Sequence, residues 1–426
     1  MSKLQAGLGI TTITPPMGVE MSGYGYYLNR RCDGVMADLY SKALVLDDGN
    51  TRVAIVAKDI IGVDRDITSK TRALIEADTG IPPEHVLLAC SHTHSGPATI
   101  FLRGCGEVDR PYVEMLIRLM ASAVMMANSA LEPVTMRVGS GHLDNMSHNR
   151  VVQGSPIDPE VGVVSFYRED SRLLAVLANF SCHSVTLGGG NRKISPDYCG
   201  ATANIVESIF PESKMLFLQG SCGDVNPRMR GAPEQAGTLL AGEVLKTIVT
   251  SDEVENVTLS AASKLIGLPL VPPDISEVRR TLEVNKAKLE STDTQGSELV
   301  EARFLTDWAE SMFARLTDAK GLRLKKLSGE PETKLNTEIQ VIKLGNIALA
   351  CNPSELFTEF ALKIKQQAKM KTFNIGYAND FVGYIPDRGD FERGGYAAAR
   401  VPLICDNFPF EVDVGDVLVE EVINLI

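Results

Sequence analysis

The sequence lacks several features that mark common classes of protein. No apolar run reaches the about 18 residues that a membrane-spanning helix requires. The amino terminus, MSKLQAGLGITTITPP, has no continuous apolar core of the kind found in secretory signals. The 8 cysteines include no CxxC pair, which argues against a disulfide scaffold. We therefore expect a soluble, cytoplasmic protein whose cysteines are reduced and mostly buried.

Basic residues are also in short supply. The chain has 42 Lys and Arg against 54 Asp and Glu, a formal net charge of -12, and no basic cluster dominates it. Nucleic acids and anionic membranes are bound by proteins with clustered Lys and Arg. We expect neither nucleic acid nor stable membrane association, and a small-molecule substrate as the partner. The sequence leaves open whether the protein forms a homo-oligomer.

The residues that are present indicate an ordinary folded chain with a sizeable core, because 44% of the 426 residues are hydrophobic. Short apolar runs ending in small polar residues predict strands at 52–60, 85–93, 173–183 and 214–223. Helical spacing over 64–80 and 110–131 predicts helices between them. This alternation predicts the α/β class, with mixed β-sheets flanked by helices.

Residues 274–330 differ from their surroundings, being charged and helix-prone, and they contain the single Trp. They predict two helices that shape access to a pocket, mediate oligomerisation or cover a sheet edge. Strand character returns at about 335–356, with a hairpin turn around 344–346. We therefore expect one domain over 1–426, interrupted by a helical insertion at about 274–330.

Polar motifs follow the predicted strands, where open α/β sheets usually bind ligands. CSHTHSGP contains His92 and His94, and alternation along a strand would point both imidazoles to one side. A polar bend explains this motif alone equally well. His183 follows another apolar strand, so three of the 6 histidines lie at strand ends, which favours a metal site. Further motifs are GDVNP at 223–227, a predicted helix start at Glu355, and a loop with Tyr384 and Tyr396.

Five of these motifs occur together in an order similar to that of the neutral ceramidase family: CSHTHSGP, the His183 strand, GDVNP, PSELF and NDFVGYIP. The chain resembles that family's catalytic domain over nearly its whole length. The resemblance implies one catalytic zinc per chain, held by His92, His183, Glu355 and Tyr384. It also implies that the substrate pocket is lined, and the scissile carbonyl polarised, by His94, Arg150 and Tyr396. Two imidazoles with a carboxylate are independently a usual catalytic zinc set.

One departure from the family concerns the nucleophile. The family has a serine in the GDVNP turn where this chain has Asn226, and an amide cannot attack a carbonyl. We therefore expect metal-bound water to attack a zinc-polarised carbonyl, with Asn226 positioning that water and Asp224 orienting or deprotonating it. Asp224 is alternatively a structural cap of its own turn. Arg150 and Arg228 are expected to bind an anionic group of the substrate, although surface salt bridges explain them equally well.

Two further departures concern the substrate. Ceramide-hydrolysing members of the family carry a carboxyl-terminal immunoglobulin-like domain and usually a secretion signal, and we expect neither here. The sequence therefore favours a hydrolase of an amide, ester or lactone bond in a small soluble substrate, with ceramide hydrolysis disfavoured. The alternatives are a non-catalytic, metal-containing protein that binds a small ligand, and a metal-dependent isomerase or lyase.

Overall fold

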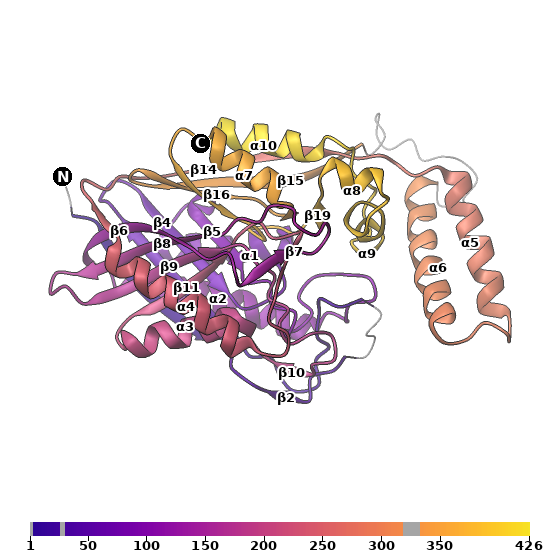
Figure 1. Cartoon of the computed structure of the whole chain (residues 1–426), viewed down its shortest axis with the longest axis horizontal. Coiled ribbons are helices and arrows are strands. Elements are labelled where there is room, and N and C mark those ends of the chain that lie inside the picture. The colour runs from indigo at the N-terminus through magenta and orange to yellow at the C-terminus, as the bar shows by residue number, and fades with distance from the viewer. Residues whose placement is uncertain (1–2, 26–29, 318–332) are drawn as a thin grey trace.

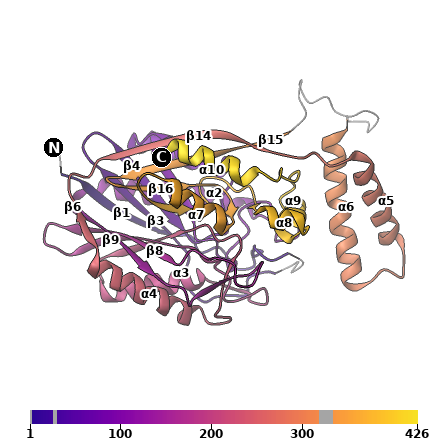
Figure 2. The ribbon, with the colours of Figure 1, turned by 45° about the horizontal axis from the view of Figure 1, so that its top comes forward.

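The computed structural model describes residues 3–25, 30–317 and 333–426. Two β-sheets stack face to face, and helices cover the outer face of each (Figures 1 and 2). This arrangement confirms the predicted class of mixed sheets flanked by helices. None of the helices in these ranges is long and apolar enough to cross a membrane.

The larger sheet has nine strands in the order β11-β9-β8-β6-β1-β3-β4-β5, with β13 pairing to β6. Neighbours are antiparallel except for the parallel pairs β4–β5 and β9–β11. The strands are β1 (Gln5–Thr12), β3 (Tyr40–Asp47), β4 (Arg52–Lys58), β5 (Val86–Cys90), β6 (Glu132–His142), β8 (Glu160–Arg168), β9 (Leu173–Phe180), β11 (Lys214–Gln219) and β13 (Asp252–Val254).

The smaller sheet has four strands, β14 (Leu259–Pro269), β15 (Lys334–Leu344), β16 (Ile347–Cys351) and β18 (Lys371–Ile375). The hairpin predicted around 344–346 joins β15 to β16, with Leu344 opposite Ile347 and Gly345 at φ 59°. Three two-stranded pairs complete the strands: β2 (Gly34–Val35) with β10 (Lys193–Ile194), β7 (Ser147–Asn149) with β12 (Val225–Pro227), and β17 (Glu355–Leu356) with β19 (Tyr384–Ile385).

Alternation along the strands separates two hydrophobic layers. On β3, Leu44 and Leu46 pack with Ile342 and Leu349 of the smaller sheet, so this cluster fills the space between the sheets. Val45 instead packs with residues of the helix Arg110–Ser129 on the opposite face. Strand β3 therefore contributes side chains to both hydrophobic layers.

Helices form the outer layers. The larger sheet is covered by α1 (Arg65–Thr79), α2 (Arg110–Ser129), α3 (Asp197–Ile209) and α4 (Pro233–Thr250). The smaller sheet is covered by α7 (Thr358–Gln367) and α10 (Val414–Leu425), whose Val414 and Leu418 pack with strand residues such as Leu268. Short helical segments lie at η1 (Pro83–His85), α8 (Arg388–Glu392), η2 (Tyr396–Arg400) and α9 (Val401–Ile404).

Two long helices, α5 (Ile275–Glu290) and α6 (Gly296–Leu316), follow β14 and precede β15 in the chain. They pack against each other and project at one end of the molecule (Figures 1 and 2). We call them the helical hairpin. Phe304 of α6 joins a hydrophobic cluster of the main body, and Ser311 donates a hydrogen bond of 2.7 Å to Asp406. Residues 318–330 of the predicted insertion lie outside the described residues.

Four strands end earlier than predicted, at Lys58, Cys90, Phe180 and Gln219. The polar residues that follow each strand leave the ladder and form loops at one end of the sheets. Residues 376–379, after β18, lie between two of these strand ends, because Gly376 donates to the carbonyl of Gln219 and Asn379 donates to that of Leu88. This crossing segment brings the loops of both sheets together.

Candidate metal centre

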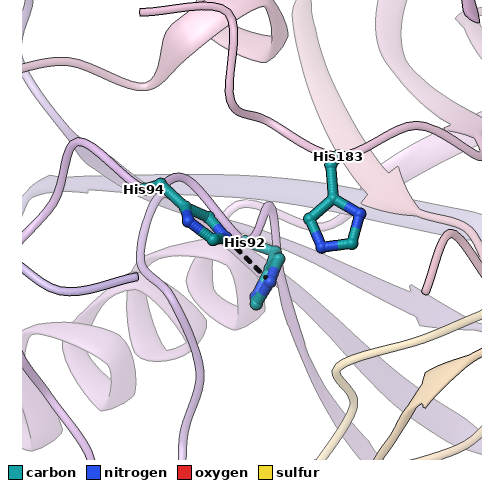
Figure 3. Close-up of side chains that lie close together, drawn as sticks. All are labelled: His92, His94 and His183. Atoms are coloured by element: carbon teal, nitrogen blue, oxygen red, sulfur yellow. Dashed lines mark hydrogen bonds between the residues drawn. The ribbon is translucent and has the colours of Figure 1, made fainter. Parts of the chain in front are cut away.

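Three buried histidines converge from two loops of the larger sheet. His92 and His94 follow β5 and His183 follows β9, and all three are at most 8% exposed. One ring nitrogen from each lies within 4.8 Å of the others. Figure 3 shows His92 and His94 in contact, with His183 approaching from the other loop. Such a group could hold a metal ion.

Backbone carbonyls fix the tautomers of two of these rings. The Nδ1 atom of His92 lies 2.7 Å from the carbonyl oxygen of Ile61, and that of His183 lies 2.6 Å from the carbonyl oxygen of Cys222. A carbonyl only accepts, so each Nδ1 must donate, which leaves Nε2 unprotonated on the neutral ring. Metal-binding histidines are usually oriented by a second hydrogen bond of this kind.

Glu355 supplies a carboxylate between the two fixed rings. Its Oε2 lies 2.9 Å from Nε2 of His183 and 3.3 Å from Nε2 of His92. Burial, the largest influence, raises the pKa of this carboxyl, whereas His92 and His183 in their protonated forms would hold it well below its usual value. The sequence prediction that Glu355 begins a helix is wrong, because it lies in β17 and α7 begins at Thr358.

Pairing of β17 with β19 explains how Tyr384 joins the group. The two short strands are parallel, with Glu355 directly opposite Tyr384. The Tyr384 hydroxyl lies 3.3 Å from Nε2 of His183 and accepts a hydrogen bond of 2.6 Å from Nη2 of Arg150. Arg150 is held in turn by the carbonyl of Gly223, at 2.8 Å. The four residues that the family resemblance implies as ligands therefore lie together, although their role as ligands stays a prediction.

His94 completes the cluster from the opposite side. Its Nε2 lies 3.1 Å from Nε2 of His92, and its ring meets the edge of Tyr24 at 5.0 Å. Burial lowers its pKa well below the usual value, helped by His92 and His183, so the ring is neutral near pH 7. Gly23, at φ 100°, lies so close that a Cβ there would be 2.4 Å from Nδ1 of His94.

Backbone strain accompanies this geometry. His92 has φ 57°, in the left-handed region that ordinary residues avoid. The prediction that strand alternation points His92 and His94 to one side is therefore wrong in its cause, since both lie beyond the end of β5. Their rings meet because the chain turns sharply at His92.

Tyr377 is a part of the site that the sequence prediction missed. Its ring stacks on His92 with centroids 4.0 Å apart, and its hydroxyl lies 3.1 Å from Sγ of Cys222. It is fully buried and also has a left-handed φ, of 54°. Its one signal in the sequence was its place beside Gly376, at the start of the loop that carries Tyr384.

Three other predicted site residues lie further out. Tyr396 is 55% exposed and contacts the ring of Tyr384 edge-on at 6.0 Å. Arg228 is exposed, and its Nε donates to the carbonyl of Ser147 at 2.9 Å. Asn226 lies in β12 opposite His148, and its side-chain oxygen is buried without a hydrogen-bond partner among the described residues.

Asp224 is hydrogen-bonded to Thr358, the first residue of α7. One carboxylate oxygen accepts from the backbone N–H and the hydroxyl of Thr358, at 2.9 and 2.8 Å, and the other accepts from Asn149 at 2.7 Å. Burial raises its pKa against these hydrogen bonds. These hydrogen bonds give Asp224 a structural role at the start of α7, whereas the alternative prediction was a cap of its own turn. Its predicted part in activating water remains a prediction.

Known proteins resemble this chain in both sequence and structure. Residues 4–240 match a family described as neutral/alkaline non-lysosomal ceramidase, N-terminal. The neutral ceramidase of Pseudomonas aeruginosa is 27% identical over 252 residues, covering 53% of this chain and 37% of that protein. The neutral ceramidase of Drosophila melanogaster is 21% identical over 260 residues, covering 53% of this chain and 36% of that protein. The matched segments thus span little more than a third of these relatives.

The crystal structure of the Pseudomonas aeruginosa neutral ceramidase superposes with a TM-score of 0.77 at 20% identity, covering 100% of this chain and 74% of that one. A ceramidase structure in complex with C2 gives the same TM-score at 18% identity. These structures share the fold of the whole chain, including the part beyond residue 240 that carries Glu355 and Tyr384. The chain therefore belongs to the neutral/alkaline non-lysosomal ceramidase family.

Proposed function

We propose that this chain is a zinc-dependent hydrolase of an amide, ester or lactone bond in a small soluble substrate. The observation that carries the proposal is the convergence of two unprotonated Nε2 atoms, on His92 and His183, with the carboxylate of Glu355. Membership of a family whose relatives are named neutral ceramidases supports hydrolysis of an acyl bond.

The donor set suits zinc. Imidazole nitrogens and a carboxylate oxygen are its common ligands in catalytic sites, and a buried group of this kind disfavours the all-oxygen shells of magnesium or calcium. We assign His92, His183, Glu355 and Tyr384 as the residues that hold it. Zinc bound there would supply a Lewis acid that polarises a carbonyl and lowers the pKa of water.

The surrounding residues would orient the substrate. Neutral His94 carries one N–H on its ring and lies beside His92, where it can donate to a substrate carbonyl oxygen. Arg150 fixes the hydroxyl of Tyr384 toward the centre. The side-chain oxygen of Asn226, which has no partner in the part of the chain that the structure describes, is available to accept from a substrate N–H or from water. We infer that Asn226 positions and does not attack.

A second candidate function rests on Asn226 itself. If the turn that carries a serine in the family needs that hydroxyl for turnover, this chain would bind a small ligand at its metal without hydrolysing it. We favour hydrolysis because the four residues that the family resemblance implies as metal ligands all lie together. We also propose a small molecule as the partner, in place of nucleic acid or a membrane.

The first experiment is to measure the zinc content of the purified protein by elemental mass spectrometry. We expect about one zinc per chain in the natural protein, and loss of zinc in His92→Ala and Glu355→Ala. His142→Ala is the matched control, because the side chain of His142 is 67% exposed and its Nε2 lies 3.7 Å from a carboxylate oxygen of Asp144. Natural protein that stays free of zinc after incubation with it would refute the proposal.

Turnover separates the two functions. The natural protein and the same variants would be assayed with a panel of amides, esters and lactones. Hydrolysis that disappears in His92→Ala but persists in His142→Ala supports the enzyme. Zinc binding without hydrolysis of any panel member favours the binding protein, and a product of unchanged mass would indicate an isomerase.

A further inference from the structure

The short strand pair β7–β12 is tied to the metal centre through both of its strands. In β12, the backbone carbonyl oxygen of Val225 lies 3.2 Å from Nδ1 of His183, and Asn226 is the next residue. Strand β7 is followed directly by Arg150, which donates to the hydroxyl of Tyr384 at 2.6 Å. A substrate held at the centre would therefore lie beside this strand pair.

His148 and Asn226 share one face of the pair. They lie directly opposite each other in the antiparallel register, so their side chains point the same way. Nδ1 of His148 and the side-chain oxygen of Asn226 are both buried, and neither has a hydrogen-bond partner within residues 3–25, 30–317 and 333–426. Buried polar groups are usually paired, so two unpaired ones on one face indicate that a ligand or an ordered water completes them.

Two exposed arginines follow Asn226 on the same strand and the turn after it. The Nε atom of Arg228 donates to the carbonyl of Ser147 at 2.9 Å, which holds this side chain alongside β7. Burial lowers the pKa of His148, and the nearby Arg228 and Arg230 lower it further against a hydrogen bond with the backbone of Asn226. The two charged groups that act on His148 are thus both cations.

These arginines have no carboxylate beside them in the part of the chain that the structure describes. Elsewhere a carboxylate neutralises the guanidinium, as where Arg72 pairs with Glu338 at 2.7 Å. The acidic residue closest in the sequence, Asp224, already accepts from Thr358 and Asn149. Since the whole chain has a net charge of -12, two cations without acidic neighbours create a local attraction for an anion that the rest of the surface lacks.

The anion would lie on the amine side of the scissile bond. In the proposed function, the side-chain oxygen of Asn226 accepts from a substrate N–H, and His148 and Arg228 flank that residue. In an N-acyl amino acid, a single carbon separates the amide nitrogen from the carboxylate. A substrate whose N–H contacts Asn226 would therefore direct its carboxylate toward these two side chains. Arg150 is less suited to this role, because the carbonyl of Gly223 and the Tyr384 hydroxyl already accept from it.

We propose that His148, Arg228 and Arg230 bind the carboxylate of an N-acyl amino acid whose amide is the scissile bond. The inference rests on the proposed function and names the substrate class of the same site. Hydrolysis would add one water across the C–N bond, with the hydroxyl on the acyl carbon and the proton on the nitrogen. The products are a carboxylic acid and a free amino acid.

The test compares N-acetyl-L-alanine, N-acetyl-L-leucine and N-acetyl-L-phenylalanine with the corresponding N-acetyl amino alcohols, which lack only the carboxylate. We expect kcat/KM at least about tenfold higher for the acids, because hydrogen bonds to charged groups are the stronger ones. Arg228→Gln should lower this preference about tenfold, mainly through KM, and Arg228→Lys should lower it less, since it keeps the charge. Arg280→Gln is the matched control, because Arg280 is an exposed arginine of α5. It should leave the preference unchanged.

Calorimetric titration with N-methanesulfonyl-L-phenylalanine provides a readout without turnover, because this sulfonamide keeps the N–H and the carboxylate but has no acyl bond. Binding that is weakened about tenfold by Arg228→Gln and unchanged by Arg280→Gln supports the carboxylate site. The same binding without hydrolysis of any N-acetyl amino acid would count against the proposed enzyme alone. Acids that are hydrolysed no better than alcohols, or an equal loss on both in Arg228→Gln, would overturn the carboxylate site while leaving the hydrolase intact.

Discussion

Gly23→Ala should displace the ring of His94 and leave the other residues of the metal centre in place. The new Cβ would lie 2.4 Å from Nδ1 and 2.5 Å from Cγ of His94, whereas ordinary contacts begin at 3.4 Å. The ring must therefore move by about 1 Å, because the other atoms that it meets are buried. A shift of that size disturbs the 3.1 Å approach of His94 to His92.

We expect two effects of this substitution. Alanine at the left-handed φ of 100° costs about 1–2 kcal/mol of stability. Displacing a ring that supports a metal ligand should weaken zinc binding about 10–100-fold. Zinc affinity would be measured by competition with a chromophoric chelator, and stability by urea denaturation of the metal-free protein.

Gly18→Ala is the matched control. Gly18 has a similar φ of 86°, but nothing lies within 4 Å of its added Cβ. It should show the loss of stability without the loss of zinc affinity. Equal zinc affinity in the two variants would show that the contact with Gly23 does not position His94 for zinc binding.

Other predictions concern groups outside the centre. Burial raises the pKa of Glu160, but Lys365 and a second lysine hold it at about 2, so Glu160→Gln should cost about 2 kcal/mol at pH 7 and progressively less from pH 4.5 toward 2, as measured by urea denaturation at each pH. Asp224→Ala should cost about 2–4 kcal/mol in thermal unfolding while the protein still binds zinc, because Thr358 and Asn149 lose their acceptor. Asp406→Ala should speed hydrogen exchange in α6 with little change in the sheets, since this carboxylate holds α6 to the main body.

The local elements could be predicted from the sequence because their signals are local. Asp64 accepts a hydrogen bond from the backbone N–H of Ile67, and Gly80 has φ 72°, so α1 begins and ends where its capping residues indicate. The turn at Gly345 is likewise specified by two residues. The start of each buried strand follows from its run of apolar residues.

The arrangement of the sheets could not be predicted in this way. Pairing of β9 with β11, or of β16 with β18, depends on contacts between segments far apart in the chain. The same limit explains the error at Glu355. A two-residue strand has no periodicity, and only its pairing with Tyr384 reveals it.

The side chains of the candidate site could be named from the sequence, but the groups that hold them in position could not. His92 and His183 were indicated by their places at the ends of apolar strands, whereas Glu355 and Tyr384 were implied as ligands only by the family resemblance. The carbonyl of Ile61 that orients His92 carries no such signal, because any residue supplies a carbonyl. The hydrogen bonds of Asp224 to α7 were equally invisible, since they depend on tertiary packing.

The crossing segment 376–379 has a consequence for the order of events in folding. It joins the carbonyl of Gln219 to that of Leu88, and the strands that carry these residues are separated by more than a hundred residues of chain. Closing so long a loop is slow, because much chain entropy is lost before any contact forms. A ribosome must therefore have extended the chain past Tyr384 before His92, His183 and Glu355 can meet it. Zinc would be acquired only after the strand ends of both sheets have come together.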